Sequence, residues 1–213
     1  MPISAKTAAA GAALAIVAVL GGTWALTLGS GANDPFKDCR VGARAGAAQI
    51  GGPFTLLSET GETVTDREVI TKPSLVYFGY SWCPDVCPID NTRNAAAADM
   101  LDAMGYDVTP VFISVDTARD TPESLTEYTD LMSPKMIGLT GTEAQIDAAV
   151  KAYRAYYKVA DPTDPQTLID HSTQTYLMDP ERGYLDFYDR DTPPEEVARS
   201  VACFIDTLKT NDK

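Results

Sequence analysis

The chain has 213 residues, which is room for one domain of ordinary size plus an appendage. Hydrophobic residues make up 45% and charged residues 22%, which excludes a disordered chain and a multi-span membrane protein. The net charge of −13, from 17 Lys and Arg against 30 Asp and Glu, argues against nucleic acid as a partner and against a peripheral grip on anionic lipid.

A long uncharged segment near the N-terminus predicts a membrane anchor. Residues 8–28 are mostly Ala, Leu, Ile and Val, and about 20 such residues cross a bilayer. Positive charge precedes the segment and Asp34 follows it, so residues 1–7 are predicted to be cytoplasmic. A cleaved signal peptide is the alternative, although its apolar region is usually shorter and ends in an Ala-x-Ala-like site. The N-terminal segment is poor in Arg and Ser, which favours a bacterial export segment over a mitochondrial presequence. We therefore expect a single-pass protein of the bacterial inner membrane whose C-terminal domain lies in the periplasm.

The next segments predict a linker and then one globular domain. Residues 29–48 are rich in Gly and Ala, which is typical of a linker, and residues 49–213 form the predicted domain. Residues 54–58 and 62–65 flank a turn at Gly61 and predict a β-hairpin.

The centre of the domain alternates between strands and helices. Residues 74–80 form an almost continuous apolar run, which predicts a strand buried on both faces, and residues 110–115 predict a second. The Ala-rich residues 91–104 between them predict a helix that ends at Gly105. Three further helices are predicted from start signals at Thr121, Thr142 and Thr192.

The last strand pair completes the fold prediction. Residues 173–178 and 183–188 are predicted strands joined by a turn, and they precede the last helix. The predicted order is hairpin, strand, helix, strand, helix, helix, hairpin, helix. This order favours an α/β thioredoxin-like fold with an added N-terminal β-hairpin.

Two of the four cysteines lie where a central strand gives way to a helix. Cys83 and Cys87 are separated by three residues, so on a helix their Cβ atoms would lie about 5–6 Å apart on one face. A relaxed disulfide needs about 3.5–4.5 Å between the two Cβ atoms, so a bridge here would be strained. Because strained disulfides are easily reduced, we expect a redox-active pair. Two convergent thiolates also suit a metal ion. A plain structural disulfide is the alternative.

The only histidine lies just before a predicted strand, in Asp170-His171-Ser172. Alone it would usually be a surface or core residue. In a thioredoxin-like arrangement, however, the loop before this strand faces the start of the cysteine helix. A site of two sulfurs and one imidazole nitrogen suits Cu(I), and also Cu(II) or Zn(II). Asp170 is predicted to orient the ring, unless it is only an exposed turn carboxylate.

With these motifs the sequence resembles the Sco/SenC family of copper proteins needed for cytochrome c oxidase assembly. The resemblance runs from Ile50 to the final helix. It rests on Tyr77-Phe-Gly-Tyr80, Cys83-Pro-Asp-Val-Cys87-Pro88, Ser114-Val-Asp116, Arg119-Asp-Thr-Pro122 and Asp170-His-Ser172. The family's usual Pro after Val-Asp is replaced here by Thr117. The resemblance implies one N-terminal membrane helix and one copper per monomer, with Cys83, Cys87 and His171 as ligands.

The resemblance also implies two uses of the cysteine pair. As a metallochaperone, the chain would take copper from an upstream periplasmic donor and deliver it to the CuA centre of cytochrome c oxidase subunit II. As a thiol–disulfide reductase, with Cys83 and Cys87 as the redox-active pair, it would reduce the cysteines of that centre or other exported thiols. A peroxiredoxin-like peroxidase is a third reading, but such enzymes usually have Thr where Tyr80 stands. A zinc site with an open fourth position also remains open.

The other two cysteines are predicted to pair with each other and not with the metal. In the last predicted helix, Cys203 points about 140° away from the centre of the apolar stripe, so it is not a core residue. An exposed free thiol is a liability in an exported protein, and Cys39 lies in the predicted linker. Free thiols, or pairing between molecules, are the alternatives.

Overall fold

The computed structural model describes residues 16–24, 34–41 and 50–211. The chain separates into two units, Met1–Asp38 and Cys39–Lys213. In the first unit, residues 16–24 are helical. None of the helices within the described ranges is long and apolar enough to cross a bilayer. Most of the predicted anchor at 8–28 lies outside these ranges, as do the predicted boundaries at residues 28 and 48.

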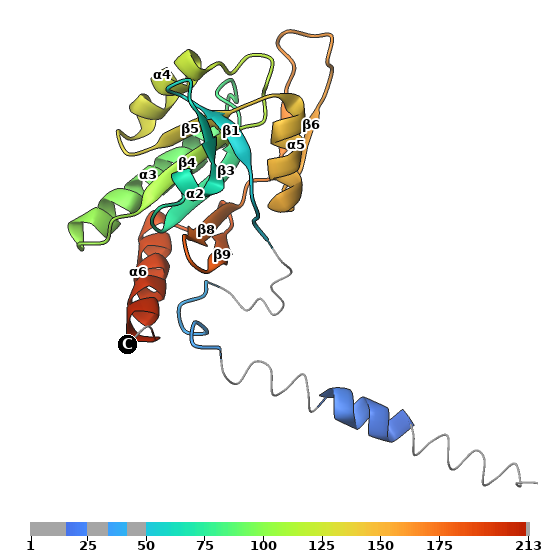
Figure 1. Cartoon of the computed structure of the whole chain (residues 1–213), viewed down its shortest axis with the longest axis vertical. Coiled ribbons are helices and arrows are strands. Elements are labelled where there is room, and N and C mark those ends of the chain that lie inside the picture. The colour runs from blue at the N-terminus through green and yellow to red at the C-terminus, as the bar shows by residue number, and fades with distance from the viewer. Residues whose placement is uncertain (1–15, 25–33, 42–49, 212–213) are drawn as a thin grey trace, which may run out of the picture. The chain divides into compact units, whose positions relative to one another are not determined.

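The second unit is built on a seven-stranded sheet with the order β2-β1-β5-β4-β3-β8-β9 (Figure 1). The parallel strands β3, β4 and β5 form its centre, while β1 runs antiparallel to β5 and β8 runs antiparallel to β3. Every residue of β3 and β4 is buried, as their continuous apolar runs predict. The strands are β1 (Thr55–Ser58), β2 (Thr63–Thr65), β3 (Ser74–Gly79), β4 (Thr109–Ser114), β5 (Ile137–Thr140), β8 (Thr175–Asp179) and β9 (Gly183–Tyr188).

The helices lie on both faces of the sheet. Figure 1 shows α3, α4 and α6 on one side and α5 on the other, in contact with β1. They are α2 (Asp66–Val69), α3 (Val86–Ala103), α4 (Pro122–Met132), α5 (Glu143–Ala152) and α6 (Pro194–Asn211). Two predicted starts are confirmed: Thr121 accepts the N–H of Ser124, and Thr142 accepts the N–H of Gln145. The β1–β2 hairpin is also confirmed, and Gly61 takes the positive φ of 82° that its turn requires.

Three short strands are absent from the predicted order. β5 joins the β1–β2 hairpin to the rest of the sheet. β6 (Tyr157–Val159) and β7 (Ile169–His171) pair with each other in a separate two-stranded sheet. Each of these strands has only three or four residues, which is too few to show a periodicity that distinguishes a strand from a loop.

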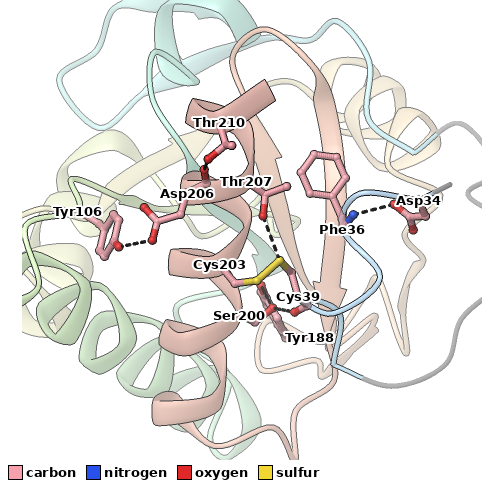
Figure 2. Close-up of a disulfide and its surroundings, with 10 residues drawn as sticks. All are labelled: Asp34, Phe36, Cys39, Tyr106, Tyr188, Ser200, Cys203, Asp206, Thr207 and Thr210. Atoms are coloured by element: carbon pink, nitrogen blue, oxygen red, sulfur yellow. Dashed lines mark hydrogen bonds between the residues drawn. A yellow bond between two sulfur atoms is a disulfide. The ribbon is translucent and has the colours of Figure 1, made fainter. Parts of the chain in front are cut away.

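The predicted pairing of Cys39 and Cys203 is confirmed. The two residues form a disulfide with their Cα atoms 5.3 Å apart, and it joins the segment around Cys39 to α6. Figure 2 shows the surroundings of this bond: the Ser200 hydroxyl donates to the Cys39 carbonyl at 2.6 Å, and the Tyr188 hydroxyl donates to Ser200 at 3.0 Å. The alternative of two free thiols is therefore wrong for this structure.

Candidate metal centre

The free cysteines of the described chain meet at the start of α3, but not on one face of it as predicted. Cys83 lies in the turn before the helix, and Cys87 is the second residue of the helix. The helix begins at Val86, five residues before its predicted start. The N–H of Cys87 donates to the Cys83 sulfur at 3.4 Å. Cys83 therefore occupies the position of an anion at a helix N-terminus, where free amides and the helix dipole favour negative charge.

This arrangement makes the two thiols unequal. A hydrogen bond from the Cys87 thiol and backbone N–H groups lower the pKa of Cys83 to about 4. The same hydrogen bond and burial raise the pKa of Cys87. Of the two thiols, Cys83 therefore loses its proton more readily. Cys83 is the thiolate, which is the form that attacks disulfides and binds metals.

His171 supplies a nitrogen to the same point. It is the last residue of β7 rather than part of a loop, and its Nε2 lies 3.3 Å from the Cys87 sulfur. Its Nδ1 lies 2.9 Å from the carbonyl oxygen of Ser172. Because a carbonyl only accepts, Nδ1 carries a proton, and Nε2 is the ring nitrogen that faces the sulfurs. The prediction that Asp170 orients this ring is wrong, since Asp170 is exposed and a backbone carbonyl holds the ring.

Two tyrosines set the orientation of the imidazole: Tyr77 in β3, and Tyr80 directly after that strand. The ring of Tyr77 lies 6.0 Å from that of His171 and the ring of Tyr80 lies 5.7 Å away, both at almost 90°. Such edge-to-face contacts restrict rotation of the enclosed ring. The Tyr77 hydroxyl also donates to the buried Asp90 at 2.9 Å. The imidazole is thus held on two sides and at Nδ1, and Nε2 remains available.

The three predicted ligands fit one soft metal ion. The sulfurs of Cys83 and Cys87 and a ring nitrogen of His171 lie within 4.8 Å of one another. Two thiolates suit Cu(I), and an imidazole in addition suits Cu(II) or Zn(II). His171 is half-exposed, so the site can be reached from solvent.

Sequence reasoning missed the residues that hold the cysteine turn in place. Asp120 is buried, and it accepts the N–H of Ser81 at 2.9 Å and the hydroxyls of Ser81 and Ser114. It belongs to the motif Arg119-Asp-Thr-Pro122, which was recognised in the sequence without a role. The sequence does carry a signal for such a role: Asp120 is a charged residue that follows a buried strand, at the sheet edge where the sites of α/β proteins form.

The comparisons with known proteins agree with this geometry. A family model described as SCO1/SenC matches residues 42–206. The chain belongs to the SCO1/SenC family. It is 70% identical to Protein SenC of Rhodobacter capsulatus over 210 residues, which are 99% of this chain and 95% of that protein. It is 43% identical to the mitochondrial SCO1 homolog 1 of Arabidopsis thaliana over 163 residues, which are 76% of this chain and 49% of that protein.

Solved structures of SCO1/SenC members share the fold. Arabidopsis thaliana ScoI, with copper bound, is 38% identical with a TM-score of 0.69, over 76% of this chain and 99% of that one. Yeast Sco1, with copper bound, is 34% identical with a TM-score of 0.70, over 75% and 90% of the two chains. These likenesses confirm the α/β thioredoxin-like fold. Homologous structures thus hold copper, and Cys83, Cys87 and His171 form a possible metal site here.

Proposed function

We propose that this chain binds one copper ion per monomer through Cys83, Cys87 and His171. The observation that carries the proposal is the convergence of two sulfurs and one ring nitrogen within 4.8 Å. This donor set matches the preferences of both copper oxidation states. The proposal is supported by the Sco structures of Arabidopsis and yeast, which were solved with copper bound.

We propose further that the bound copper is cargo for cytochrome c oxidase. The family resemblance supports delivery to the CuA centre of subunit II, with an upstream periplasmic copper donor as the source. BsSco, 21% identical to this chain, is described as a member of the Sco family of cytochrome c oxidase assembly proteins. A metallochaperone in this role would act in the periplasm, anchored to the inner membrane by residues 8–28.

Thiol–disulfide reduction is the second candidate, and the lowered pKa of Cys83 favours it. The Cys83 thiolate would attack a target disulfide and form a mixed disulfide, which releases one target thiolate. Cys87 would then lose its proton and attack Cys83, which releases the second target thiolate. The chain ends oxidised by two electrons and the target ends reduced by two. This reaction does not require His171, so the histidine distinguishes the two candidates.

Copper titration of the reduced full-length chain tests the first proposal. We expect one equivalent to bind, Cys83→Ser and Cys87→Ser each to abolish tight binding, and His171→Ala to weaken Cu(II) and change its absorption spectrum. The double variant Cys39→Ser/Cys203→Ser is the matched control, because it removes the other cysteine pair, and it should bind copper normally. An unchanged Cu(II) spectrum and affinity in His171→Ala would refute the three-ligand site.

A transfer experiment separates delivery from reduction. The copper-loaded chain is mixed with the copper-free CuA domain of subunit II, prepared once with reduced and once with oxidised cysteines. Delivery predicts that copper appears in the reduced domain and that His171→Ala impairs the transfer. Reduction predicts that the copper-free chain converts the oxidised domain to thiols, and that His171→Ala does so equally well.

Alkaline extraction of membranes that contain the full-length chain tests the anchor: release into the soluble fraction would contradict it.

A further inference from the structure

Arg119 touches both parts of the chain that supply the proposed ligands. One part is the cysteine turn, residues 80–85, and the other is the hairpin loop, residues 160–168, which leads into β7. The guanidinium lies 5.7 Å from the ring centre of Tyr80 and 6.0 Å from that of Trp82, which is next to Cys83. Its Nη1 donates to the carbonyl of Pro165 in the hairpin loop at 3.3 Å. One side chain therefore links the two ligand-bearing parts.

Arg119 is itself held from the central sheet. Its Nε donates to the buried carboxylate of Asp116, and its backbone N–H donates to the same carboxylate at 3.2 Å. Asp116 follows β4, and the Asp116 N–H donates to the Ser114 hydroxyl at the end of that strand. The planar guanidinium can make these contacts together because it bonds at its edge and stacks with its face.

The hairpin that carries His171 needs such a link. β6 and β7 form a two-stranded sheet of their own, with no backbone ladder to the seven-stranded sheet. A two-stranded hairpin is marginally stable unless side chains pack it onto the rest of the molecule. Tyr80 supplies part of that packing, since its ring contacts His171 at 5.7 Å and its hydroxyl accepts the N–H of Ile169 at 3.4 Å. Arg119 lies on the same Tyr80 ring, so it supports the hairpin at two points.

We propose that Arg119 is a positioning residue that sets the distance between the cysteine pair and His171, and thereby favours Cu(II) over Cu(I). The inference rests on the proposed copper function. Both thiolates come from the junction of β3 and α3, and two thiolates are sufficient for Cu(I). The imidazole comes from the hairpin, and it is a donor that suits Cu(II). Loss of Arg119 should therefore weaken the binding of Cu(II) far more than that of Cu(I).

The test compares Arg119→Gln with the wild type in the reduced full-length chain. Dissociation constants for Cu(I) and Cu(II) are measured by competition with chelators, and the Cu(II) site is followed by electron paramagnetic resonance. We expect a Cu(II) dissociation constant raised about tenfold or more, as for lost outer contacts of other metal sites. The resonance parameters of Cu(II) should change, and the Cu(I) constant should stay within about twofold, well below that range.

The chain offers a matched control in Arg40→Gln. Arg40 donates to the carbonyl of Leu185 at 2.7 Å, pairs with Asp186 at 3.6 Å and lies 5.6 Å from the ring centre of Phe204. These are the same three kinds of contact that Arg119 makes, in a part of the molecule that supplies no proposed ligand. Both copper constants of this variant should equal those of the wild type.

A second variant and a metal-free measurement make the outcome decisive. Arg119→Lys keeps the charge but lacks the planar group, so we expect the same selective loss of Cu(II), and this variant decides if Arg119→Gln does not fold. In the copper-free chain, amide hydrogen exchange in β6 and β7 should rise in both Arg119 variants and not in Arg40→Gln.

Three results separate the inference from the proposed function. Unchanged Cu(II) binding in the Arg119 variants, or an equal loss of affinity for Cu(I) and Cu(II), would overturn the positioning role and leave the proposed copper binding of the wild type standing. Unchanged hydrogen exchange in β6 and β7 would overturn it without reference to copper. A wild type that binds no copper would remove the proposed function and, with it, the preference for Cu(II).

Discussion

At the scale of single residues, the two free thiols differ because the fold places them differently. Cys83 precedes a helix, and its sulfur accepts a hydrogen bond from the Cys87 amide of that helix. Cys87 lies inside the helix and is fully buried. A helix N-terminus stabilises a thiolate and burial destabilises one, so Cys83 loses its proton more readily than Cys87. The spacing of the two residues suggests a symmetric pair, and only their positions relative to the helix show the asymmetry.

The lowered pKa of Cys83 predicts reactivity far below neutral pH. An ordinary cysteine has a pKa of about 8.5, and is therefore almost entirely a thiol at about pH 6. We expect iodoacetamide to modify Cys83 readily at about pH 6, with the rate falling only as the pH approaches about 4. Mass spectrometry of peptides from the reduced chain identifies the modified residue. Modification that begins only above about pH 8, as in an unperturbed thiol, would contradict the lowered pKa.

The lowered pKa of Cys83 also predicts that the free energy of unfolding rises with pH. The folded-state pKa of about 4 lies below the ordinary thiol pKa of about 8.5, so the unfolded chain binds more protons between these limits. The contribution of Cys83 to the free energy of unfolding is therefore complete above the ordinary value and is lost as the pH falls toward 4. Urea unfolding of the reduced, copper-free chain should show a steeper rise with pH than Cys83→Ser. Identical slopes would refute the assignment.

Gly79, at the end of β3, leaves room for the Cys87 sulfur. A Cβ atom built at this position would lie 2.8 Å from the Cys87 sulfur and 2.9 Å from the Tyr77 ring. Both neighbours are buried, so neither can move away freely. We expect Gly79→Ala to lower the free energy of unfolding by about 1–3 kcal/mol, as overpacked cores do, and to alter the Cu(II) spectrum. Gly105→Ala is a useful comparison, because no atom lies within 4 Å of its added Cβ and its positive φ of 84° confines the strain to the backbone.

At the scale of elements, the connection between β4 and α4 holds the cysteine turn. Asp120 in this connection accepts three hydrogen bonds, two of them from Ser81. Arg119, its neighbour, contacts the hairpin loop as well. A single short connection therefore supports both ligand-bearing parts. Asp120 holds the cysteine turn, and Arg119 contacts both the cysteine turn and the hairpin loop.

Asp120→Asn should loosen the cysteine turn. An amide has only one acceptor oxygen, so its NH2 group would face one of the serine hydroxyls, which would then have to accept instead of donate. We expect the free energy of unfolding to fall by about 1–3 kcal/mol, and the affinities for Cu(I) and Cu(II) to fall together because Ser81 precedes Cys83. Chemical unfolding and copper competition measure the two effects. Asp130→Asn, on the exposed face of α4, should change neither. A selective loss of Cu(II) would contradict this role for Asp120.

Elements with long or well-marked sequences were predictable, and short ones were not. β3 and β4 are fully buried strands of six mostly apolar residues, and the starts of α4 and α5 carry capping residues. The first turn of α3 gave no such signal, because its buried Asp90 is polar and hydrogen-bonds to the Tyr77 hydroxyl, so it adds nothing to an apolar periodicity. The predicted helical segment at residues 91–104 therefore began five residues too late.

At the scale of the whole molecule, one covalent link joins distant parts of the chain. The disulfide connects Cys39 to Cys203 over a sequence separation of 164 residues. Cys39 is 4% exposed, and its carbonyl is held by Ser200 of α6. In the chain-entropy picture, such a link stabilises the folded state by restricting the unfolded chain.

Removal of this link should lower stability without affecting copper. We expect Cys39→Ser/Cys203→Ser to lose up to roughly 5 kcal/mol of the free energy of unfolding, the value for a closed loop of more than about 100 residues. The copper stoichiometry and spectrum should not change, because no residue of the metal centre contacts the bridge. Urea unfolding of the oxidised chain measures the loss. An unchanged unfolding midpoint would show that the bridge contributes nothing to stability.

The sequence alone was sufficient for the family resemblance, the thioredoxin-like class and the three candidate ligands, and it favoured the pairing of Cys39 with Cys203, which the structure then showed. Each of these follows from residue type and spacing, or from apolar periodicity, which are local properties of the chain. The tertiary structure decided that Cys83 lies before the helix, that His171 comes from a hairpin outside the main sheet, and that Arg119 and Asp120 support the site. These depend on contacts between residues that are tens of positions apart in the sequence, such as Arg119 with Pro165 and Cys87 with His171. No local pattern encodes such contacts, because they exist only when the packed sheet brings its loops to one edge.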